Sequence, residues 1–171
     1  KFHPVLKINL PKKLIIKKFS KEILNYKWDL IVVAVSSLGI DLVKKNLNNA
    51  KNKCPVLVLT KGLKYDKNSK KIITMSEQLS IGNKFTVSSL KGPCLANELA
   101  RKIKSSTVIA NKNIKVAQSI GKLISTSYYQ VEFSKDIRGV EISSAIKNIY
   151  SMIIGSGEGL NTSSSIFRKS I

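Results

Sequence analysis

The chain of 171 residues, 43% of them hydrophobic, is long enough to bury the core of one domain or slightly more. Its formal net charge of +20 comes from 30 lysines and arginines against 10 acidic residues. Nearly all of these basic residues are lysines, and they are spread along the whole chain, so we expect a lysine-rich solvated surface and no specific nucleic-acid interface. No apolar run approaches the roughly 18 residues that a membrane-spanning helix needs, so we expect no membrane span.

Short apolar, β-branched runs alternate along the chain with stretches of helical periodicity. The first two runs, Asp29–Val35 and Pro55–Thr60, are almost continuously apolar, which is typical of strands buried on both faces. The pattern predicts further strands at 85–90, 107–110 and 129–133, and helices at 38–50, 72–79, from about 93, at 114–125 and from 137 to the end.

This alternation predicts an α/β fold with a mainly parallel sheet and helices on both of its faces. In such sheets ligands bind beyond the carboxyl ends of the strands, where residues 35–37, 60–62 and 91–94 form the loops. From about Ile137 the alternation stops and only a helical pattern continues. We therefore expect one domain over residues 1–136 and the start of a second, helical domain over 137–171.

Two of these loops carry candidate ligand-binding groups. Lys61 follows the second buried strand, where its ammonium group could pair with a phosphate or steady a carbonyl group. Residues 92–96 form a strand-to-helix turn, in which Pro93 suits the first helical turn and free backbone amides could hold an anion or a nucleotide. Taken alone, Lys61 is more simply interpreted as a solvated lysine, and residues 92–96 as an ordinary helix start.

The most informative feature is Lys147 beside Asn148 in an otherwise apolar, small-residue helix. An ammonium group is costly to bury without a partner, so a lysine there needs an anionic or carbonyl ligand, a carboxylate or a route to water. Ser144 lies one turn earlier, and the small residues around it let another backbone or a ligand approach closely. A lysine that extends to the surface is the alternative, but the combination favours a functional site.

Other kinds of site have less support in the sequence. There is no Gly-x-Gly-x-x-Gly fingerprint and no evident cluster of metal ligands. The single histidine, His3, argues against histidine-based catalysis and multi-histidine metal sites in these residues. Cys54 and Cys94 are too few for a zinc motif or a disulfide framework, and they fit a reducing cytoplasm.

Several motifs, in order, resemble those of the bacterial type of NAD(P)-dependent glycerol-3-phosphate dehydrogenase. Family members carry a Leu-Pro element, a strand ending in Val-Pro-Ser, a Ser/Thr-Lys-Gly loop, a Gly-Pro-Ser/Thr-Phe-Ala-x-Glu turn and the helix motif Gly-Val-Glu-x-x-x-Ala-x-Lys-Asn-Ile/Val. The matching segments are residues 7–11, 35–37, 60–62, 92–98 and 139–149, with 155–160 similar to the family's Gly-x-x-x-Gly-Leu.

The resemblance implies a partial Rossmann-type sheet followed by the start of an all-helical substrate domain. It implies an oxidoreductase that uses NAD or NADP to interconvert dihydroxyacetone phosphate and sn-glycerol 3-phosphate for phospholipid biosynthesis, in the cytoplasm, with a homodimer as one option. Lys147 matches the catalytic lysine, which would polarise the substrate carbonyl and donate a proton. The implied substrate contacts are Lys61, Gly92, Cys94, Lys147 and Asn148, and the implied cofactor contacts are Lys61, Ala96, Ser36 and Phe2.

Departures from the family pattern leave alternatives open. Cys94 stands where the family has a hydroxyl residue, and Ser36 stands where it has proline. The family's glycine-rich turn is expected before Lys1 and its Arg-Asn phosphate motif after Ile171, so we expect the isolated chain to be inactive. The alternatives are a related reductase of the 6-phosphogluconate or ketopantoate type, and a catalytically dead basic protein that would bind duplex DNA with a steep salt dependence.

Overall fold

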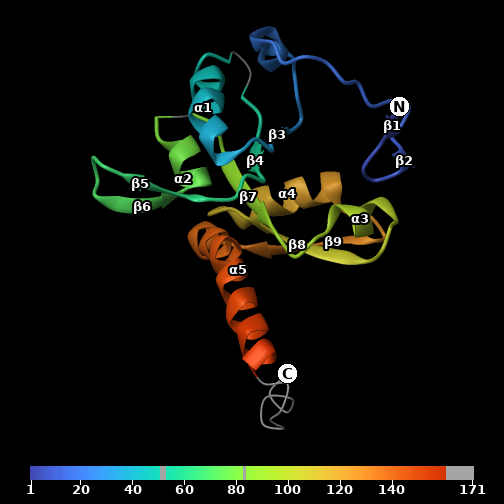
Figure 1. Ribbon diagram of the computed structural model, residues 1–171. Helices are drawn as coiled ribbons and strands as arrows, with labels where there is room; N and C mark the ends of the chain where they lie inside the picture. The colour runs from blue at the N-terminus through green and yellow to red at the C-terminus, as the bar shows by residue number, and fades with distance from the viewer. Residues whose placement is uncertain (51–52, 83, 161–171) are drawn as a thin grey trace.

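A five-stranded sheet organises the computed structural model, which describes residues 1–50, 53–82 and 84–160 (Figure 1). In spatial order its strands are β3 (Ile31–Val33), β4 (Val56–Val58), β7 (Val87–Lys91), β8 (Ser105–Ala110) and β9 (Tyr129–Ser134). Each of these strands falls within or beside a run that the sequence predicts, because continuous apolar or alternating runs of β-branched residues suit a buried pleated surface.

The sheet is mainly parallel, as predicted. β3, β4 and β7 run parallel to one another, β8 runs antiparallel to β7, and β9 runs parallel to β8. The reversal takes place over residues 92–104, which include the short helix α3 (Ala96–Ala100). The carboxyl ends of β3, β4 and β7 therefore share one edge of the sheet, and their three following loops lie together there.

Helices cover both faces of the sheet, which confirms the second part of that prediction. On one face α1 (Ile40–Asn48), which follows the 3₁₀ turn η2 (Ser37–Gly39), and α2 (Met75–Ser80) pack on the strands. Their shared core consists mainly of Leu24, Val33, Ile40, Leu47, Val56, Val58, Met75, Leu79 and Val87. On the other face α4 (Ile114–Ile124) buries Ala117 and Ile120 against Leu57 and Ile109.

The predicted helix at 72–79 is wrong over its first three residues. Leu63–Asp66 (β5) and Lys71–Thr74 (β6) pair as an antiparallel hairpin, and α2 begins only at Met75. Ile72, Ile73 and Thr74 are all β-branched, and this favours a strand over the helical spacing of their apolar neighbours. Thr74 then caps α2 with a capping box, in which its side chain and that of Glu77 each accept a hydrogen bond from the other residue's backbone amide.

The N-terminal residues form a small unit beside the sheet. β1 (Phe2–His3) and β2 (Ile8–Asn9) pair antiparallel, and a 3₁₀ turn, η1 (Lys21–Asn25), follows before β3. Figure 1 shows β1 and β2 apart from α1 and α2, on the side of the molecule where α3 lies. Only Leu24 of this segment joins the core of buried residues.

One long helix, α5 (Ile137–Leu160), follows β9 and runs away from the sheet (Figure 1). Its first turns pack on β7, β6 and β8, whereas Ile149, Tyr150, Met152 and Ile153 are all more than half exposed. The predicted helix from Ile137 is confirmed as far as Leu160, and residues 161–171 of the expected helical domain lie outside the described residues. Over the described part of the chain, no helix is both long and apolar enough to cross a membrane.

Candidate active site

Side-chain hydrogen bonds tie together the loops at the carboxyl edge of the sheet. Thr60, between β4 and Lys61, donates from Oγ1 to the carbonyl oxygen of Val35 at 2.8 Å. Thr107 of β8 donates from its buried Oγ1 to the carbonyl oxygen of Lys91 at 3.0 Å. These bonds hold the ends of β3, β4 and β7 at fixed positions, so groups on the loops have defined places.

A cavity of about 460 Å³ lies between the Gly92 turn and the first turns of α5, and we call it the helix cavity. Its lining residues come from β7 and the turn after it, from β8 and β9, and from one side of α5. They are Lys91, Gly92, Pro93, Val108, Ser134, Asp136, Gly139, Val140, Ser143, Ser144 and Lys147. The fold therefore brings the predicted residues Gly92 and Lys147, which lie far apart in sequence, to one cavity.

A second cavity, of about 260 Å³, opens around the turn after β7, and we call it the turn cavity. It is lined by Leu59, Lys61, Leu90, Lys91, Gly92, Cys94, Ala96, Leu99, Thr107 and Tyr129. Lys91 and Gly92 line both cavities, so the end of β7 is their common wall. Lys61, Cys94 and Ala96, all predicted site residues, meet in the turn cavity.

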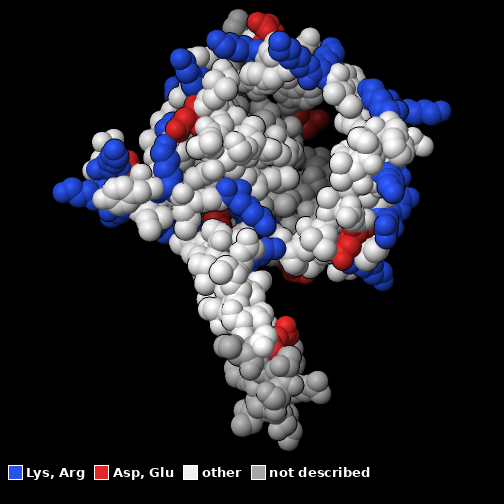
Figure 2. Space-filling view, viewed as in Figure 1, with Lys and Arg blue, Asp and Glu red and all other residues white. Residues whose placement is uncertain are grey.

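Of the options that the sequence leaves open for Lys147, the structure shows a route to water. Its side chain is exposed on α5 while it lines the helix cavity, so its ammonium group has a route to water. Beyond Lys147, the described part of α5 carries only one charged residue, Glu158, and Figure 2 shows that this stretch is almost free of charge. Lysines instead surround the rest of the visible surface, which agrees with the predicted lysine-rich exterior.

Gly92 is required by a close approach of the chain's own backbone. A Cβ atom added there would lie 3.0 Å from the carbonyl oxygen of Ser106 and 3.0 Å from Cα of Thr107, both in β8. Cys94 is half-buried and its thiol donates to that same Ser106 oxygen at 3.0 Å, so this contact already uses its hydrogen. Both residues thus fix the turn on β8 as well as lining the turn cavity.

Three of the predicted site residues lie outside both cavities. Asn148 is exposed on α5, next to Lys147, and it lines neither the helix cavity nor the turn cavity. Ser36 is exposed directly before η2, beyond the carboxyl end of β3. Phe2 is 61% exposed in the small β1–β2 unit. In the part of the chain that the structure describes, none of these three side chains lines a cavity together with Lys61 or Lys147.

Sequence reasoning missed a buried ion pair under the helix cavity. Lys91 Nζ lies 3.4 Å from Oε1 of Glu141, and the side chains of both residues are almost completely buried. Burial lowers the pKa of Lys91, attraction and hydrogen bonding to Glu141 oppose that change, and nearby Lys61 lowers it further. The available signal was Lys91, a charged residue that directly follows the strand predicted at 85–90 and directly precedes Gly92.

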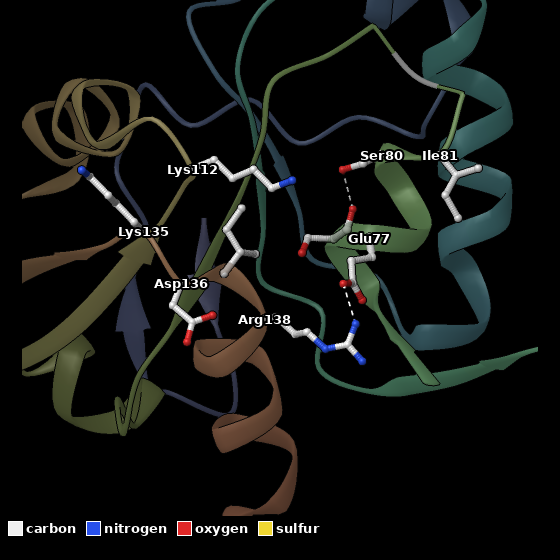
Figure 3. A pocket seen from close by; sticks show the side chains of 9 residues that line it. Glu77, Ser80, Ile81, Lys112, Lys135, Asp136 and Arg138 are labelled. Atoms are coloured by element: carbon white, nitrogen blue, oxygen red, sulfur yellow. Dashed lines mark hydrogen bonds and ion pairs between the residues drawn. The ribbon is translucent and has the colours of Figure 1, made fainter. Parts of the chain in front are cut away.

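A third cavity, of about 470 Å³, lies between α2 and the start of α5 (Figure 3). Its basic residues Lys112 and Lys135 follow β8 and β9, while Arg138 is held by Glu77 in an ion pair of 2.9 Å. Within the described residues, no group of three or more histidine, cysteine, aspartate or glutamate side chains is placed to hold a metal ion. The candidate site is built from lysines, hydroxyl-bearing side chains, backbone groups and apolar side chains.

Residues 3–117 match the family model described as the NAD-dependent glycerol-3-phosphate dehydrogenase N-terminus. The chain belongs to this family. It is 31% identical over 136 residues to the glycerol-3-phosphate dehydrogenase [NAD(P)+] of Syntrophobacter fumaroxidans, covering 77% of this chain and 39% of that protein. It is also 31% identical over 108 residues to the chloroplastic glycerol-3-phosphate dehydrogenase [NAD(+)] 2 of Arabidopsis thaliana, covering 63% of this chain and 25% of that one. The chain thus spans well under half the length of these relatives.

Solved structures of the family share the fold. The Plasmodium falciparum glycerol-3-phosphate dehydrogenase superposes with a TM-score of 0.70 at 22% identity, over 82% of this chain and 40% of that one. The enzyme from Coxiella burnetii gives a TM-score of 0.65 at 22% identity, over 82% of this chain and 42% of that one. At this identity the likeness concerns the fold, and it confirms the Rossmann-type α/β class predicted from the sequence.

The turn cavity combines apolar surface with a positive charge. Leu59, Leu90 and Leu99 offer apolar surface for a flat ring, and Lys61 offers a positive charge for a phosphate. Ala96 adds a small side chain at the start of α3. Because the cavity opens beyond the carboxyl ends of β4 and β7, it is also where open α/β sheets bind ligands.

Proposed function

We propose that the full-length gene product containing this chain interconverts dihydroxyacetone phosphate and sn-glycerol 3-phosphate with NAD or NADP, in the cytoplasm, and so serves phospholipid biosynthesis. One observation carries the proposal: in a chain of this family, Lys147 of α5 lines a cavity whose opposite wall is the Gly92 turn at the carboxyl end of the sheet. Two free cysteines, and no disulfide among the described residues, support the cytoplasmic location.

Lys147 would act as the proton donor. Its exposed ammonium group can donate a hydrogen bond to a ketone oxygen placed in the helix cavity, which polarises the carbonyl bond. As negative charge develops on that oxygen, Nζ of Lys147 gives up a proton and completes the alcohol. The nicotinamide ring supplies the hydride when it is bound.

Other residues of the site would bind and orient. Lys61, which lines the turn cavity, would attract a phosphorylated substrate through its positive charge, whereas the charge of the buried Lys91 is balanced by Glu141. Gly92 and Cys94 shape the turn, and Asn148 would order the substrate from its place next to Lys147. Lys61, Ala96, Ser36 and Phe2 would contact the cofactor, in a domain of residues 1–136 to which the helical substrate domain from 137 is joined.

Replacing Lys147 with alanine in the full-length gene product tests the proposal. We expect kcat for dihydroxyacetone phosphate to fall by about 10²–10⁴-fold, because general acid catalysis contributes roughly that factor. The dissociation constant of the reduced cofactor, measured by its fluorescence, should stay unchanged. Lys45→Ala, an exposed lysine of α1 outside both cavities, is the matched control and should retain full activity.

A substrate panel separates this enzyme from related reductases. The proposal expects turnover of dihydroxyacetone phosphate and none of ketopantoate, 6-phosphogluconate or unphosphorylated dihydroxyacetone, because the lysines around the site select for phosphate. Equal turnover of the unphosphorylated ketone, or an unchanged kcat in the Lys147→Ala variant, would overturn the proposed function.

A further inference from the structure

Glu141 is the meeting point of three elements. Its carboxylate, 3% exposed in α5, accepts hydrogen bonds from the backbone amide of Ser76 at 3.2 Å, from the Ser76 hydroxyl, and from the Ser89 hydroxyl at 3.0 Å. Ser76 belongs to α2 and Ser89 to β7. A buried carboxylate is stable only when it is paired and hydrogen-bonded, and this one has both kinds of partner.

Lys91 completes this network from the end of β7. Its Nζ donates to the carbonyl oxygen of Val58 in β4 at 3.0 Å and lies 3.4 Å from Oε1 of Glu141. The ammonium group thereby ties β4 and β7 to α5, directly before the turn that begins at Gly92. Removing either charge would leave the other buried without its partner, which is strongly destabilising for such pairs.

The rest of α5 depends on the attachment of its first turns, in which the Lys91–Glu141 network is buried and the ion pair of Arg138 with Glu77 is partly exposed. From Ile149 onward, almost all described side chains of the helix are exposed, so only its first turns hold it on the sheet. Lys147 lies six residues after Glu141, which is about 9 Å along a helix axis. A small change in the direction of α5 at Glu141 therefore moves Lys147 relative to the Gly92 turn.

We propose that Lys91 and Glu141 form a positioning pair that fixes the helix of Lys147 over the carboxyl ends of β4 and β7. Lys91 lines the helix cavity, and its pairing with Glu141 sets the separation between Lys147 and the Gly92 turn. The substrate would lie between that lysine and that turn. This inference rests on the proposed function for its catalytic consequence, but the placement of α5 can be measured without it.

The kinetic test uses Glu141→Gln, Lys91→Met and the double variant in the full-length gene product. Each single variant should lower kcat by about 100-fold, since small misplacements of a catalytic group cost roughly that factor, while the KM for the cofactor stays within about twofold. The double variant should recover part of the loss, because neither charge remains unpaired. Asp41→Asn with Lys64→Met, which removes an exposed ion pair of 2.8 Å, is the control and should leave kcat unchanged.

A distance measurement tests the placement itself. Cys94 stands beside the Gly92 turn, so spin labels on Cys94 and on Lys147→Cys, in a Cys54→Ser background, report the separation of helix and turn. The distribution of distances between the two labels should be narrow when Lys91 and Glu141 are both present. It should be broader or shifted in the Glu141→Gln variant. If Glu141→Gln leaves the distance distribution unchanged, the positioning role is overturned, whether or not the enzyme turns over a ketone. If the parent enzyme is active and the single variants have the same kcat, the positioning role is also overturned. Failure of the proposed function would instead appear as an inactive parent enzyme with a shifted distribution in the variant.

Discussion

Arg138 in the first turn of α5 binds both Glu77 and the backbone before α2. Its Nη1 donates to Oε1 of Glu77 at 2.9 Å (Figure 3). Its Nη2 donates to the carbonyl oxygen of Ile72 at 2.9 Å. Glu77 also closes the capping box of α2 by accepting from the amide of Thr74 at 2.7 Å. The carboxylate of Glu77 therefore contacts two helices: Oε1 accepts from Arg138 of α5, and Oε2 accepts from the backbone amide of Thr74, which caps α2.

Glu77→Ala should cost more stability than Arg138→Met. Loss of the partly exposed ion pair costs about 0.2–1 kcal/mol, whereas Glu77→Ala also removes half of a capping box, for a total of about 1–2 kcal/mol. Urea denaturation followed by circular dichroism measures both. If the two variants were equally stable, the capping role of Glu77 would be unsupported.

Gly92→Ala should destabilise the protein by about 1–3 kcal/mol, which is the usual cost of overpacking. The added Cβ would press on backbone atoms of Ser106 and Thr107, and a strand backbone gives way less easily than a side-chain tip. Thermal unfolding measures the change. Gly159→Ala, where a Cβ would meet nothing within 4 Å, is the matched control and should keep or slightly raise the stability.

Leu57→Ala should lower the free energy of unfolding by about 2–5 kcal/mol, because it empties space in the core between β4 and α4. Leu57 is 1% exposed, while Leu38 in η2 is 92% exposed. Leu38→Ala should therefore stay within about 0.5 kcal/mol of the parent. Comparable losses in the two variants would show that the core is not placed as described.

Asp41→Asn should remove a pH-dependent stabilisation. The hydrogen bond from Lys64, followed by one from Gln78, lowers the pKa of Asp41 below its ordinary value of 3.8. Because the folded-state pKa is the lower one, the contribution is complete above pH 3.8 and is lost as the pH falls through the folded-state pKa. The pair is exposed, so the variant should be less stable by under about 1 kcal/mol near neutral pH, and the difference should vanish in acid. Denaturation at several pH values checks this, and a gap that widens in acid would contradict it.

The order and type of most elements were predictable from the sequence because they depend on local patterns. Continuous apolar runs became β3 and β4, and the helical spacing at 114–125 became α4. The hairpin β5–β6 was not predicted, because a helical spacing of apolar residues and a β-branched run overlap there. The direction of β8 was also not set by the alternation, since a strand of the same composition can pair either way.

The motifs around Lys61, Gly92 and Lys147 identified the family before any contact was known, because each motif is local in sequence and the fold of the family fixes their order. Only the tertiary structure decided which of these residues share a cavity, that Lys147 is exposed, and that Asn148, Ser36 and Phe2 lie outside the two cavities. The pairing of Lys91 with Glu141 joins residues 50 positions apart, and no local pattern encodes it. Whether a buried charge is satisfied depends on groups that long-range packing brings within about 3–4 Å, and packing is a property of the whole chain.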